Sequence, residues 1–519
     1  MNGQQVLVLG LGASGLAMAR WCARAGARVW VWDSRAEPPQ AAELARDCPQ
    51  AERLAAAFDG AGGDAQAARA LEGVARVLKS PGLAPHDPRV EPLLRQARAL
   101  GVPVQGELDL FAQALEALRL ERDYSPRVLA VTGTNGKTTT TAMTALLVAR
   151  AGRRVAMAGN VGPTLLDTLA QALAAGVLPE VWVLELSSFQ LEGGGNGVAG
   201  FEPDAAAVLN VTQDHLDWHG SMEAYVRAKA RVFGSRGVMV LNRDDPLVEA
   251  MAPPPPAPVR GRAAVRTPPR PVLRFGLGAP GAPGDFGLVV EGGMAWLVRA
   301  LPDEAEAGSR RSGAPEPAPL HLQRLMPADA LRVRGRHNAA NALAALALAC
   351  AIGCPLAPML HGLREYGGEP HRVQWIGNVG EIEAYDDSKG TNVGATVAAL
   401  QGLGADRAPA RLVVILGGDG KGQDFAPLAP AVQAHARAAA LIGRDAGRIA
   451  DALAGTGVPL QRHDTLEAAV AWCHGQAQPG DAMLLSPACA SLDMFRDYAH
   501  RAEVFAAAVG ALAAERGQP

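Results

Sequence analysis

Residues 127–152 read RVLAVTGTNGKTTTTAMTALLVARAG. The apolar first part is typical of a buried strand, and the last part has the length and composition of a helix. In the loop between them, backbone N–H groups can point at phosphate oxygens. From this loop Lys137 can bridge the β- and γ-phosphates of a nucleotide, and the Thr138 hydroxyl can bind Mg²⁺. The segment therefore predicts a strand, a phosphate loop and a helix that bind a nucleoside triphosphate.

The loop departs from the strict phosphate-loop pattern, G-x-x-x-x-G-K-[ST]. Its first position is Val131, and a glycine comes two residues later, at Gly133. The order of strand, loop and helix around it still favours a shortened phosphate loop over a chance match.

Short apolar runs alternate with Ala-, Leu- and Arg-rich stretches along the rest of the chain. The runs are VLVLG, RVWVWD, RVAMAG, VWVLELS, AAAVLNV, VMVLN, RLVVILGG, AALIG and AMLLSPA. This alternation is typical of parallel sheets covered by helices, which places the chain in the α/β class. The length of 519 residues corresponds to about three domains.

A second glycine turn lies near the N-terminus, where Gly10-Leu11-Gly12-Ala13-Ser14-Gly15 follows the run VLVLG, and the next run ends at Asp33. Glycines let a phosphate approach a helix N-terminus, and an acidic residue after the second strand accepts a hydrogen bond from a sugar or base. The pattern fits a Rossmann dinucleotide site, a site for another phosphorylated ligand, or a turn that only packs. A further turn, Ser80-Pro81-Gly82, is expected at the same sheet edge.

Charge and cysteine content exclude several classes of protein. The 49 basic and 52 acidic residues give a net charge of −3, without the positive field that attracts nucleic acid or an anionic membrane. The six cysteines form no CxxC pair, so a zinc cluster or a disulfide scaffold is not expected, and a reducing cytosol fits best.

The chain starts without a signal-peptide pattern, and no stretch is long and apolar enough to cross a bilayer. We expect a cytoplasmic monomer without membrane insertion.

Glycine and proline, 59 and 38 residues, are concentrated in part in the middle of the chain. Residues 251–271, 276–287 and 302–319 are rich in Pro, Gly or polar residues and cannot bury enough apolar surface to offset the loss of chain entropy. We expect loops or disordered insertions there that carry no chemistry. Strands are predicted between them in VLRFGL, LVVEGGMAWLV and HLQRLMP.

Two further segments place polar residues directly after apolar strands. VWVLELSSFQLE ends its strand at Glu185, a carboxylate that is costly to bury unless a cation such as Mg²⁺ lies beside it. AAVLNVTQDHLDWHG ends in Asp and His residues, of which Asp217 and His219 fit an ordinary polar loop. Lys229 follows among Ala and Val in a helix-like stretch, and its spacing alone fits a surface lysine.

Nine separated blocks of the chain resemble, in the same order, those of the Mur ligases. The blocks are GTNGKTT, ELSSFQLE, NVTQDHLD, YVRAKARVF, RGRHNAANALAALALA, EPHRVQW, YDDSKGTNVGAT, LGGDGKGQDF and SPACASLDMFRDY. The resemblance runs from the N-terminal glycine turn almost to the C-terminus. DSKGTN and SPACASLD resemble the branch of the family that adds D-glutamate.

The resemblance implies three domains. We expect an N-terminal Rossmann-like domain that holds UDP at 1–112, a central phosphate-loop ATPase domain of α/β type at 113–369, and a C-terminal Rossmann-like domain that brings the amino acid at 370–519. The Pro-rich insertions then lie at about 252–320 in the central domain. The resemblance further implies an ATP-dependent, ADP-forming amide ligase of peptidoglycan precursor synthesis. Its substrates would be UDP-N-acetylmuramoyl-L-alanine and D-glutamate, and its cofactors ATP, Mg²⁺ and a carbamylated lysine.

The resemblance also implies which residues meet each ligand. For ATP they are Gly133, Thr134, Asn135, Gly136, Lys137, Thr138, Thr139, Thr140, Asn338, Asn341, Arg372 and Asp387. For the UDP substrate they are Ser14, Asp33, Ser34, Arg35, Gly82, Asn160 and Gln190, and for D-glutamate Lys389, Thr391, Lys421, Ser491, Leu492 and Tyr498. For Mg²⁺ they are Thr138, Glu185, His215 and, if carbamylated, Lys229. The implied catalytic residues are Lys137, His215, Lys229, Arg372 and Lys389.

The resemblance implies that the N-terminal turn holds uridine diphosphate and not a nicotinamide dinucleotide. The chain departs from the family pattern in its Pro-rich insertions, in GGEPHR and HRAEVF, and at Tyr498, where Phe is usual. Three alternatives stay open. They are a related ligase that adds another amino acid or extends folate, an NAD-dependent oxidoreductase built on the first glycine turn, and a nucleotide-dependent switch without catalysis.

Overall fold

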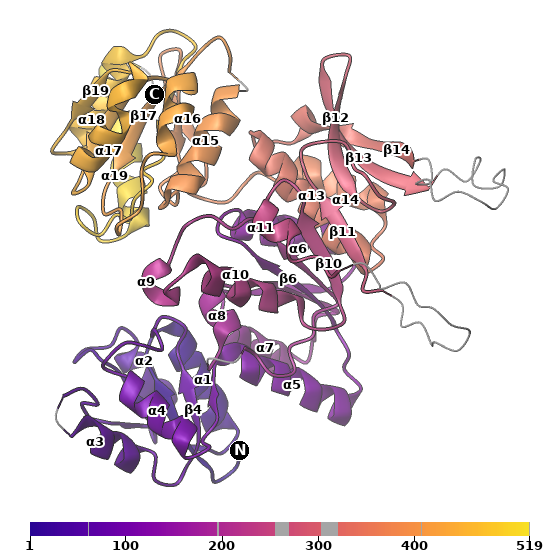
Figure 1. The fold of residues 1–519 in the computed structure, drawn as a ribbon, viewed down its shortest axis with the longest axis vertical. Coiled ribbons are helices and arrows are strands. Elements are labelled where there is room, and N and C mark those ends of the chain that lie inside the picture. Colours follow the sequence, from indigo (N-terminus) through magenta and orange to yellow (C-terminus); the bar gives the residue numbers. More distant parts are fainter. Residues whose placement is uncertain (61, 195–196, 255–268, 303–319, 406, 518–519) are drawn as a thin grey trace.

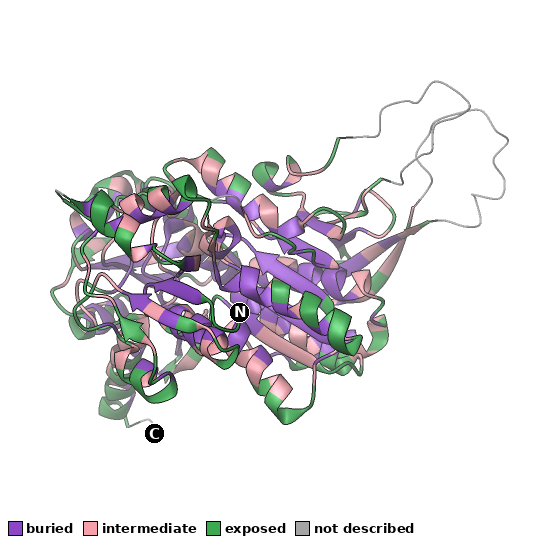
Figure 2. Cartoon of the chain, turned by 90° about the horizontal axis from the view of Figure 1, so that it is seen from below, coloured by how far each residue is buried: buried purple, intermediate pink, exposed green. Residues whose placement is uncertain are grey.

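The computed structural model describes residues 1–60, 62–194, 197–254, 269–302, 320–405 and 407–517. Three α/β domains follow one another along the longest axis of the molecule, each built around a mainly parallel sheet (Figure 1). Buried strands occupy the domain interiors, and exposed residues lie on the outer faces of the helices (Figure 2). The predicted α/β class with three domains is confirmed. Among the described helices, none combines the length and apolar character that a membrane span requires.

The N-terminal domain is built on a five-stranded parallel sheet in the order β3-β2-β1-β4-β5. Its elements are β1 (Gln5–Leu9), α1 (Ala13–Arg24), β2 (Arg28–Trp32), α2 (Ala41–Asp47), β3 (Glu52–Arg53), α3 (Gly63–Ala70), β4 (Val74–Lys79), α4 (Glu91–Ala99) and β5 (Val104–Gln105). All five residues of β1 are buried, because helices cover both faces of a parallel sheet. The turns after β1 and β4 meet at one sheet edge, as predicted.

The central domain follows α5 (Glu107–Arg122) and contains a six-stranded parallel sheet in the order β11-β10-β9-β6-β8-β7. Its elements are β6 (Arg127–Thr132), α6 (Lys137–Arg150), β7 (Val155–Gly159), α7 (Leu165–Ala175), β8 (Val181–Glu185), α8 (Ser188–Glu192), β9 (Ala205–Val208), α9 (Leu216–His219), α10 (Met222–Ala230), the 3₁₀ turn Arg231–Phe233, β10 (Val238–Asn242), α11 (Pro246–Glu249), β11 (Val272–Phe275), α13 (Arg336–Ala351) and α14 (Leu356–Glu365). Because α13 is apolar on almost every side, it is stable only inside the core, where it packs against β9, β10 and β11.

A three-stranded antiparallel sheet extends the central domain, in the order β12-β13-β14. Its strands are β12 (Phe286–Glu291), β13 (Met294–Pro302) and β14 (Leu320–Pro327), followed by the 3₁₀ turn Ala328–Ala330. The strands predicted in VLRFGL, LVVEGGMAWLV and HLQRLMP are confirmed as β11, the β12–β13 hairpin and β14. The loops or disorder predicted within 255–268 and 303–319 lie outside the described residues.

The C-terminal domain contains a six-stranded sheet in the order β15-β16-β20-β17-β18-β19, in which only β15 is antiparallel to its neighbour. Its elements are β15 (Gln374–Val379), β16 (Ile382–Asp386), α15 (Val393–Ala405), β17 (Leu412–Gly417), α16 (Leu428–His435), β18 (Ala436–Ile442), α17 (Ala446–Leu453), the 3₁₀ turn Ala454–Thr456, β19 (Leu460–Arg462), α18 (Leu466–Gln476), β20 (Ala482–Leu485) and α19 (Tyr498–Glu515). Apolar clusters cover both faces of this sheet, which explains the continuous apolar run LVVILG of β17.

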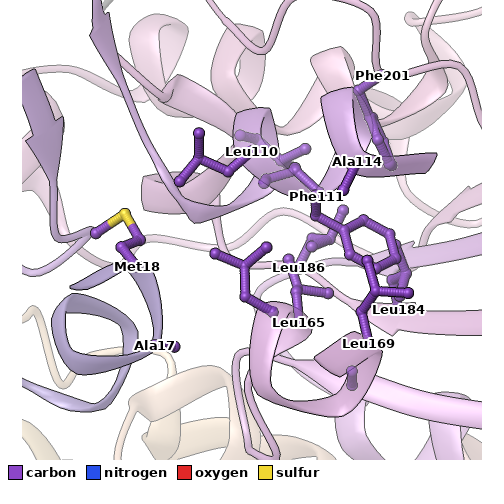
Figure 3. Close-up of a cluster of buried hydrophobic side chains, with 14 of the residues drawn as sticks. Ala17, Met18, Leu110, Phe111, Ala114, Leu165, Leu169, Leu184, Leu186 and Phe201 are labelled. Carbon is purple, nitrogen blue, oxygen red and sulfur yellow. The ribbon is translucent and has the colours of Figure 1, made fainter. Parts of the chain in front are cut away.

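The N-terminal and central domains share one hydrophobic core. A single cluster of buried side chains includes Met18 of α1, Phe111 of α5 and Leu165 of α7 (Figure 3). An ion pair between Arg20 and Asp167, at 3.0 Å, joins the same two domains. Within the described parts of the chain, no buried apolar cluster joins the central and C-terminal domains.

The expected domain limits fall in different kinds of structure. The limit after residue 112 falls inside α5, the helix that leads from the first sheet to the second. The limit between residues 369 and 370 falls in the segment between α14 and β15. Both limits stay predictions.

We predict that Gly15→Ala destabilises the N-terminal domain. A Cβ at residue 15 would lie 1.9 Å from the Gly10 carbonyl oxygen and 3.0 Å from Ser80 Oγ. Forcing extra volume into a packed site costs about 1–3 kcal/mol or more, so the thermal midpoint should fall. Gly12→Ala is the matched control, because nothing lies within 4 Å of a Cβ at residue 12 and its φ is −92°. Calorimetry measures both variants, and equal midpoints would contradict the packing argument.

Candidate active site

The phosphate loop connects β6 to α6, as predicted. Gly133 and Gly136 have φ angles of 154° and 81°, a range that glycine adopts far more readily than other residues. Asn210, which follows the neighbouring strand β9, holds the loop: its side-chain oxygen accepts from the Asn135 N–H at 2.8 Å, and its carbonyl accepts from the Thr134 N–H at 2.9 Å. The loop is therefore fixed from the next strand of the sheet.

A cavity of about 260 Å³ lies beside the loop, between the central and C-terminal domains. Its lining includes the predicted ATP residues Asn135, Gly136, Thr139, Asn338, Asn341, Arg372 and Asp387, together with Lys389. The other predicted ATP residues, Gly133, Thr134, Lys137, Thr138 and Thr140, follow along the loop and the first turn of α6 without lining the cavity. Thr140 is fully buried, so its side chain faces the core. The structure thus brings most of the predicted ATP residues to one place.

Two residues of the C-terminal domain contact the phosphate loop directly. Nη2 of Arg372 donates to the Thr138 hydroxyl at 2.6 Å. The side-chain amides of Asn392 and Asn135 exchange hydrogen bonds of 3.0 and 3.3 Å. The approach is close at Gly394, where a Cβ would lie 2.9 Å from Thr212 Oγ1 and 3.1 Å from Asn135 Nδ2. The C-terminal domain is therefore docked on the loop, with a guanidinium at the first turn of α6.

Asp387 is a buried carboxylate in the wall of the cavity. It accepts hydrogen bonds from the Ser486 hydroxyl at 2.6 Å and from the Val373 N–H at 3.3 Å. Burial raises the pKa of Asp387 to about 7, although the Ser486 hydrogen bond and the charge of Arg372 act in the opposite direction. A donor or cation in the cavity would therefore favour its charged form.

Two lysines converge on one backbone oxygen. Nζ of Lys137 and Nζ of Lys229 lie 3.0 and 2.8 Å from the Gly133 carbonyl oxygen. Lys229 is 1% exposed, and its Nζ lies 4.3 Å from the centroid of the Tyr225 ring. Burial lowers the pKa of Lys229 well below its ordinary value, and the charge of Lys137 lowers it further. The surface position that spacing alone predicted for Lys229 is wrong, because α10 turns this side chain into the interior with Tyr225 and Ala228.

Glu185 and His215 lie near Lys137, and both interact with it electrostatically. Glu185 is buried and accepts a hydrogen bond from Asn160 Nδ2 at 3.0 Å. Burial lowers the pKa of His215, which favours the neutral imidazole that binds metals. Among the described residues, no group of three His, Cys, Asp or Glu side chains could hold a metal ion. The donor set therefore fits Mg²⁺ only together with phosphate oxygens and water, which is its usual mode of binding.

The remaining polar residues after β9 make structural contacts. Nε2 of His219 lies 2.9 Å from Ser188 Oγ, and its ring lies 4.5 Å from that of Trp218. The Asp217 carbonyl lies 3.0 Å from Nε2 of His86 in the N-terminal domain. Asp217 and His219 therefore lie in the short helix α9 and not in the loop that was expected, and the contacts described here are structural.

The N-terminal glycine turn packs against the turn after β4. Ser80 Oγ donates to the Gly10 carbonyl at 2.7 Å. The Asp33 carboxylate accepts from the Leu11 N–H at 2.6 Å and from the Arg35 guanidinium at 2.9 and 2.8 Å. Burial alone would raise the pKa of Asp33, but these hydrogen bonds lower it to about 2. The other residues predicted for the UDP substrate in this domain lie nearby in the chain: Ser14 in the first turn of α1, Ser34 directly after Asp33, and Gly82 in the turn after β4.

The two residues predicted for the UDP substrate in the central domain have internal partners. Asn160 is exposed and donates to Glu185, as described above. Gln190 is buried and forms a capping box with Ser187: its Oε1 accepts from the Ser187 N–H at 3.0 Å, and its N–H donates to Ser187 Oγ at 3.2 Å. Of the two side chains, Asn160 is therefore the more accessible to a ligand.

The residues predicted for D-glutamate are Lys389, Thr391, Lys421, Ser491, Leu492 and Tyr498, all from loops or helix ends of the C-terminal domain. Nζ of Lys389 lies 3.3 Å from the Tyr498 hydroxyl and 4.8 Å from the ring centroid. A β-bridge between Asp419 and Ala490 pairs the loop of Lys421 with that of Ser491. Leu492 is 71% exposed, so this side of the site is open to solvent.

The cavity also contains residues that the sequence did not single out. Asn242, Asp244 and His337 line it. Asn242 and Asp244 stand at the end of the apolar strand β10, which is the same signal that identified Glu185. His337 gives no such signal, because it lies in a helical block, and burial lowers its pKa to about 4.

Family models match the chain in three consecutive parts. The N-terminal domain model of MurD-like Mur ligases matches residues 4–106, the Mur ligase middle domain model matches 131–259, and the glutamate ligase domain model of Mur ligases matches 371–489. Each match covers strands of a different sheet.

Curated relatives are similar over the whole chain. The UDP-N-acetylmuramoylalanine–D-glutamate ligase of Albidiferax ferrireducens is 60% identical over 524 residues, which cover 100% of this chain and 98% of that protein. The protein of the same name from Burkholderia pseudomallei is 56% identical over 518 residues, which cover 99% of this chain and 98% of that protein.

Solved structures share the fold. The UDP-N-acetylmuramate–alanine ligase MurC of Thermotoga maritima has a TM-score of 0.55 at 21% identity, with 98% of this chain and 99% of that chain covered. The MurF ligase of Thermotoga maritima in complex with ADP has a TM-score of 0.54 at 17% identity, with 89% and 94% covered. These two likenesses concern the fold alone. The identity to the curated relatives extends over the full length, and the chain belongs to the Mur ligase family.

Proposed function

We propose that the chain is an ATP-dependent, ADP-forming amide ligase that adds D-glutamate to UDP-N-acetylmuramoyl-L-alanine in peptidoglycan precursor synthesis. This is the activity in the names of relatives that are 56% and 60% identical over the full chain. The structural observation that carries it is the cavity where the phosphate loop meets Arg372 and Lys389. A nucleotide and an incoming amine have to meet at one place, and this cavity is lined by residues that we assign to ATP and by Lys389, which we assign to D-glutamate.

The first step activates a carboxylate. A carboxylate oxygen of the UDP substrate attacks the γ-phosphorus of ATP, the bond from that phosphorus to the ADP oxygen breaks, and an acyl phosphate forms. Positive groups assist by neutralising the charge that is spread over the transferring phosphoryl group. We assign this role to Lys137 and Arg372, which approach the loop from two domains. Mg²⁺, for which Thr138, Glu185 and His215 are the expected holders, would supply further charge neutralisation when bound.

The second step forms the amide. The free amine of D-glutamate attacks the acyl carbon and loses a proton, and phosphate leaves with the former acyl oxygen. Lys389 and Lys421 suit the two carboxylates of D-glutamate, since charge-assisted hydrogen bonds are the strong ones. Docking of the C-terminal domain on the loop would keep water away from the acyl phosphate.

We further propose that Lys229 is carbamylated in the active enzyme. Two ammonium groups on the Gly133 carbonyl repel each other, and burial favours the neutral amine of Lys229. A neutral amine adds CO₂ and releases a proton, which leaves an anionic carbamate. The carbamate would attract Lys137 instead of repelling it and would offer oxygen donors to Mg²⁺.

We assign the uridine diphosphate part of the substrate to the N-terminal turns. Asp33 stays ionised there, and the glycine turn leads into the N-terminus of α1, a position that suits a phosphate. An oxidoreductase built on the same turn would leave the phosphate loop and Arg372 without a role.

We infer a cytoplasmic site of action, because all six cysteines are free thiols, as in a reducing compartment.

The substrate assignment predicts a single productive amino acid. Purified protein with ATP, Mg²⁺ and UDP-N-acetylmuramoyl-L-alanine should release ADP with D-glutamate, and not with L-glutamate, L-alanine or a diamino acid. A coupled ADP assay with mass spectrometry of the product measures this. Product with only one of the other three amino acids would overturn the assignment, and tight NADH binding without UDP-sugar binding would favour the oxidoreductase.

We predict that Arg372→Ala lowers kcat about 10²- to 10³-fold, because it removes a cation from the transferring phosphoryl group. Arg364→Ala is the matched control, since Arg364 is an exposed arginine on α14. Steady-state ADP release with all substrates saturating gives both values. A variant of Arg372 with the kcat of the control would remove Arg372 from the mechanism.

The carbamate proposal predicts a carbonyl signal by ¹³C NMR after equilibration with ¹³C-labelled bicarbonate. Because burial lowers the pKa of Lys229, its amine is more readily available for CO₂ than that of an ordinary lysine, and the signal should disappear on acidification as the amine is protonated. The signal should be absent from Lys229→Arg and present in Lys421→Arg, which alters an exposed lysine. A wild-type spectrum without the signal at saturating bicarbonate speaks against carbamylation.

A further inference from the structure

Arg501 is a fully buried cation in the C-terminal domain, near the start of α19. Its Nη2 donates to the Ser388 carbonyl at 2.7 Å, and its Nη1 donates to the Cys489 carbonyl at 3.2 Å. It forms no ion pair with a carboxylate of the described residues, although Asp386 and Asp493 act on its charge at longer range. Burying a guanidinium without an anion beside it is unfavourable, so the buried position of Arg501 needs an explanation.

The two carbonyls belong to two loops of the proposed D-glutamate site. Ser388 directly precedes Lys389, and Cys489 lies two residues before Ser491. These loops follow β16 and β20, which are neighbours in the sheet. The planar, forked donor set of one arginine therefore ties both loops together at the carboxyl edge of the sheet.

A third loop is connected to the same arginine. Ala490, next to Cys489, exchanges backbone hydrogen bonds of 2.9 and 3.0 Å with Asp419. The Asp419 carboxylate in turn accepts from the Lys421 N–H at 3.0 Å. Fixing the Cys489 carbonyl therefore also restrains the loop that carries the second lysine of the site.

The backbone beside this contact is held in an uncommon conformation. Ala488 has a φ of 60°, in the left-handed region that alanine rarely adopts. Such a residue persists only where the surrounding structure holds it. The hydrogen bond from Arg501 to the next carbonyl is one of these restraints.

We propose that Arg501 is a positioning residue of the D-glutamate site, which holds the loops of Lys389, Lys421 and Ser491 in the arrangement that binds a dicarboxylate. The proposal rests on the proposed function, because it takes D-glutamate as the ligand. Arg501 is too deeply buried to touch the substrate and is not itself catalytic. Burial lowers its pKa to about 10, so that the guanidinium stays charged at neutral pH and adds positive potential behind the site.

Two substitutions test whether Arg501 positions the three loops. Arg501→Lys keeps the charge but loses the fork that reaches two carbonyls, and Arg501→Met keeps most of the volume without donors or charge. We expect the KM for D-glutamate to rise about tenfold in the lysine variant and about a hundredfold in the methionine variant. The KM for ATP should rise several-fold less than the KM for D-glutamate, because Arg501 restrains all three loops of the D-glutamate site but reaches the ATP cavity only through the loop of Asp387 and Lys389. Arg516→Met, at an exposed arginine directly after α19, is the matched control.

Hydrogen–deuterium exchange of the unliganded protein provides a readout that needs no substrate. Both variants should exchange faster in residues 387–392 and 487–492, and no faster in 127–137.

An unchanged KM for D-glutamate, an equal rise in every KM, or a loss of kcat alone would overturn the proposal. If the methionine variant does not fold, the lysine variant decides. A wild-type chain that does not use D-glutamate would refute the proposed function, whereas the exchange data would still decide whether Arg501 holds the loops.

Discussion

The amino groups of two lysines share the Gly133 carbonyl oxygen, and the repulsion between them when both are charged determines what the surrounding structure has to provide. Like charges this close repel strongly in a buried site, where water screens them little. Within the protein, Glu185 and Asp214 oppose the effect on Lys137. The phosphates of a nucleotide would complete the compensation, so the loop is suited to bind anions before any chemistry is considered.

The position of the site follows from the parallel sheets. Strands of a parallel sheet end at one edge, and polar residues placed after them gather there. The central sheet contributes Glu185 and Asn210 in this way, and the C-terminal sheet contributes Asp387. Because the two edges face each other across the cavity, each domain supplies only part of the groups that we assign to phosphoryl transfer. Docking of the C-terminal domain is therefore a structural condition for the complete site.

Much of this could be predicted from the sequence, for physical reasons that differ between residues. The apolar run before the phosphate loop and the helix after it are local patterns, so β6, α6 and the α/β class were predictable. Glu185 was predictable because a carboxylate at the end of a buried strand needs a partner. The burial of Lys229 was not, since its Ala and Val neighbours suit a surface helix as well as a core helix. His337 and Arg501 were not singled out, because their partners are distant in sequence and the fold alone brings them together.

The single core shared by the N-terminal and central domains has a consequence for cooperativity. Met18, Phe111 and Leu165 belong to one apolar cluster, so neither domain can lose its packing without exposing part of the other. The C-terminal domain has apolar clusters of its own. The contacts described at its border with the central domain are hydrogen bonds, from Arg372 and Asn392. Thermodynamically the chain therefore consists of two units of unequal size, of which the smaller can separate from the larger at little cost in buried apolar surface.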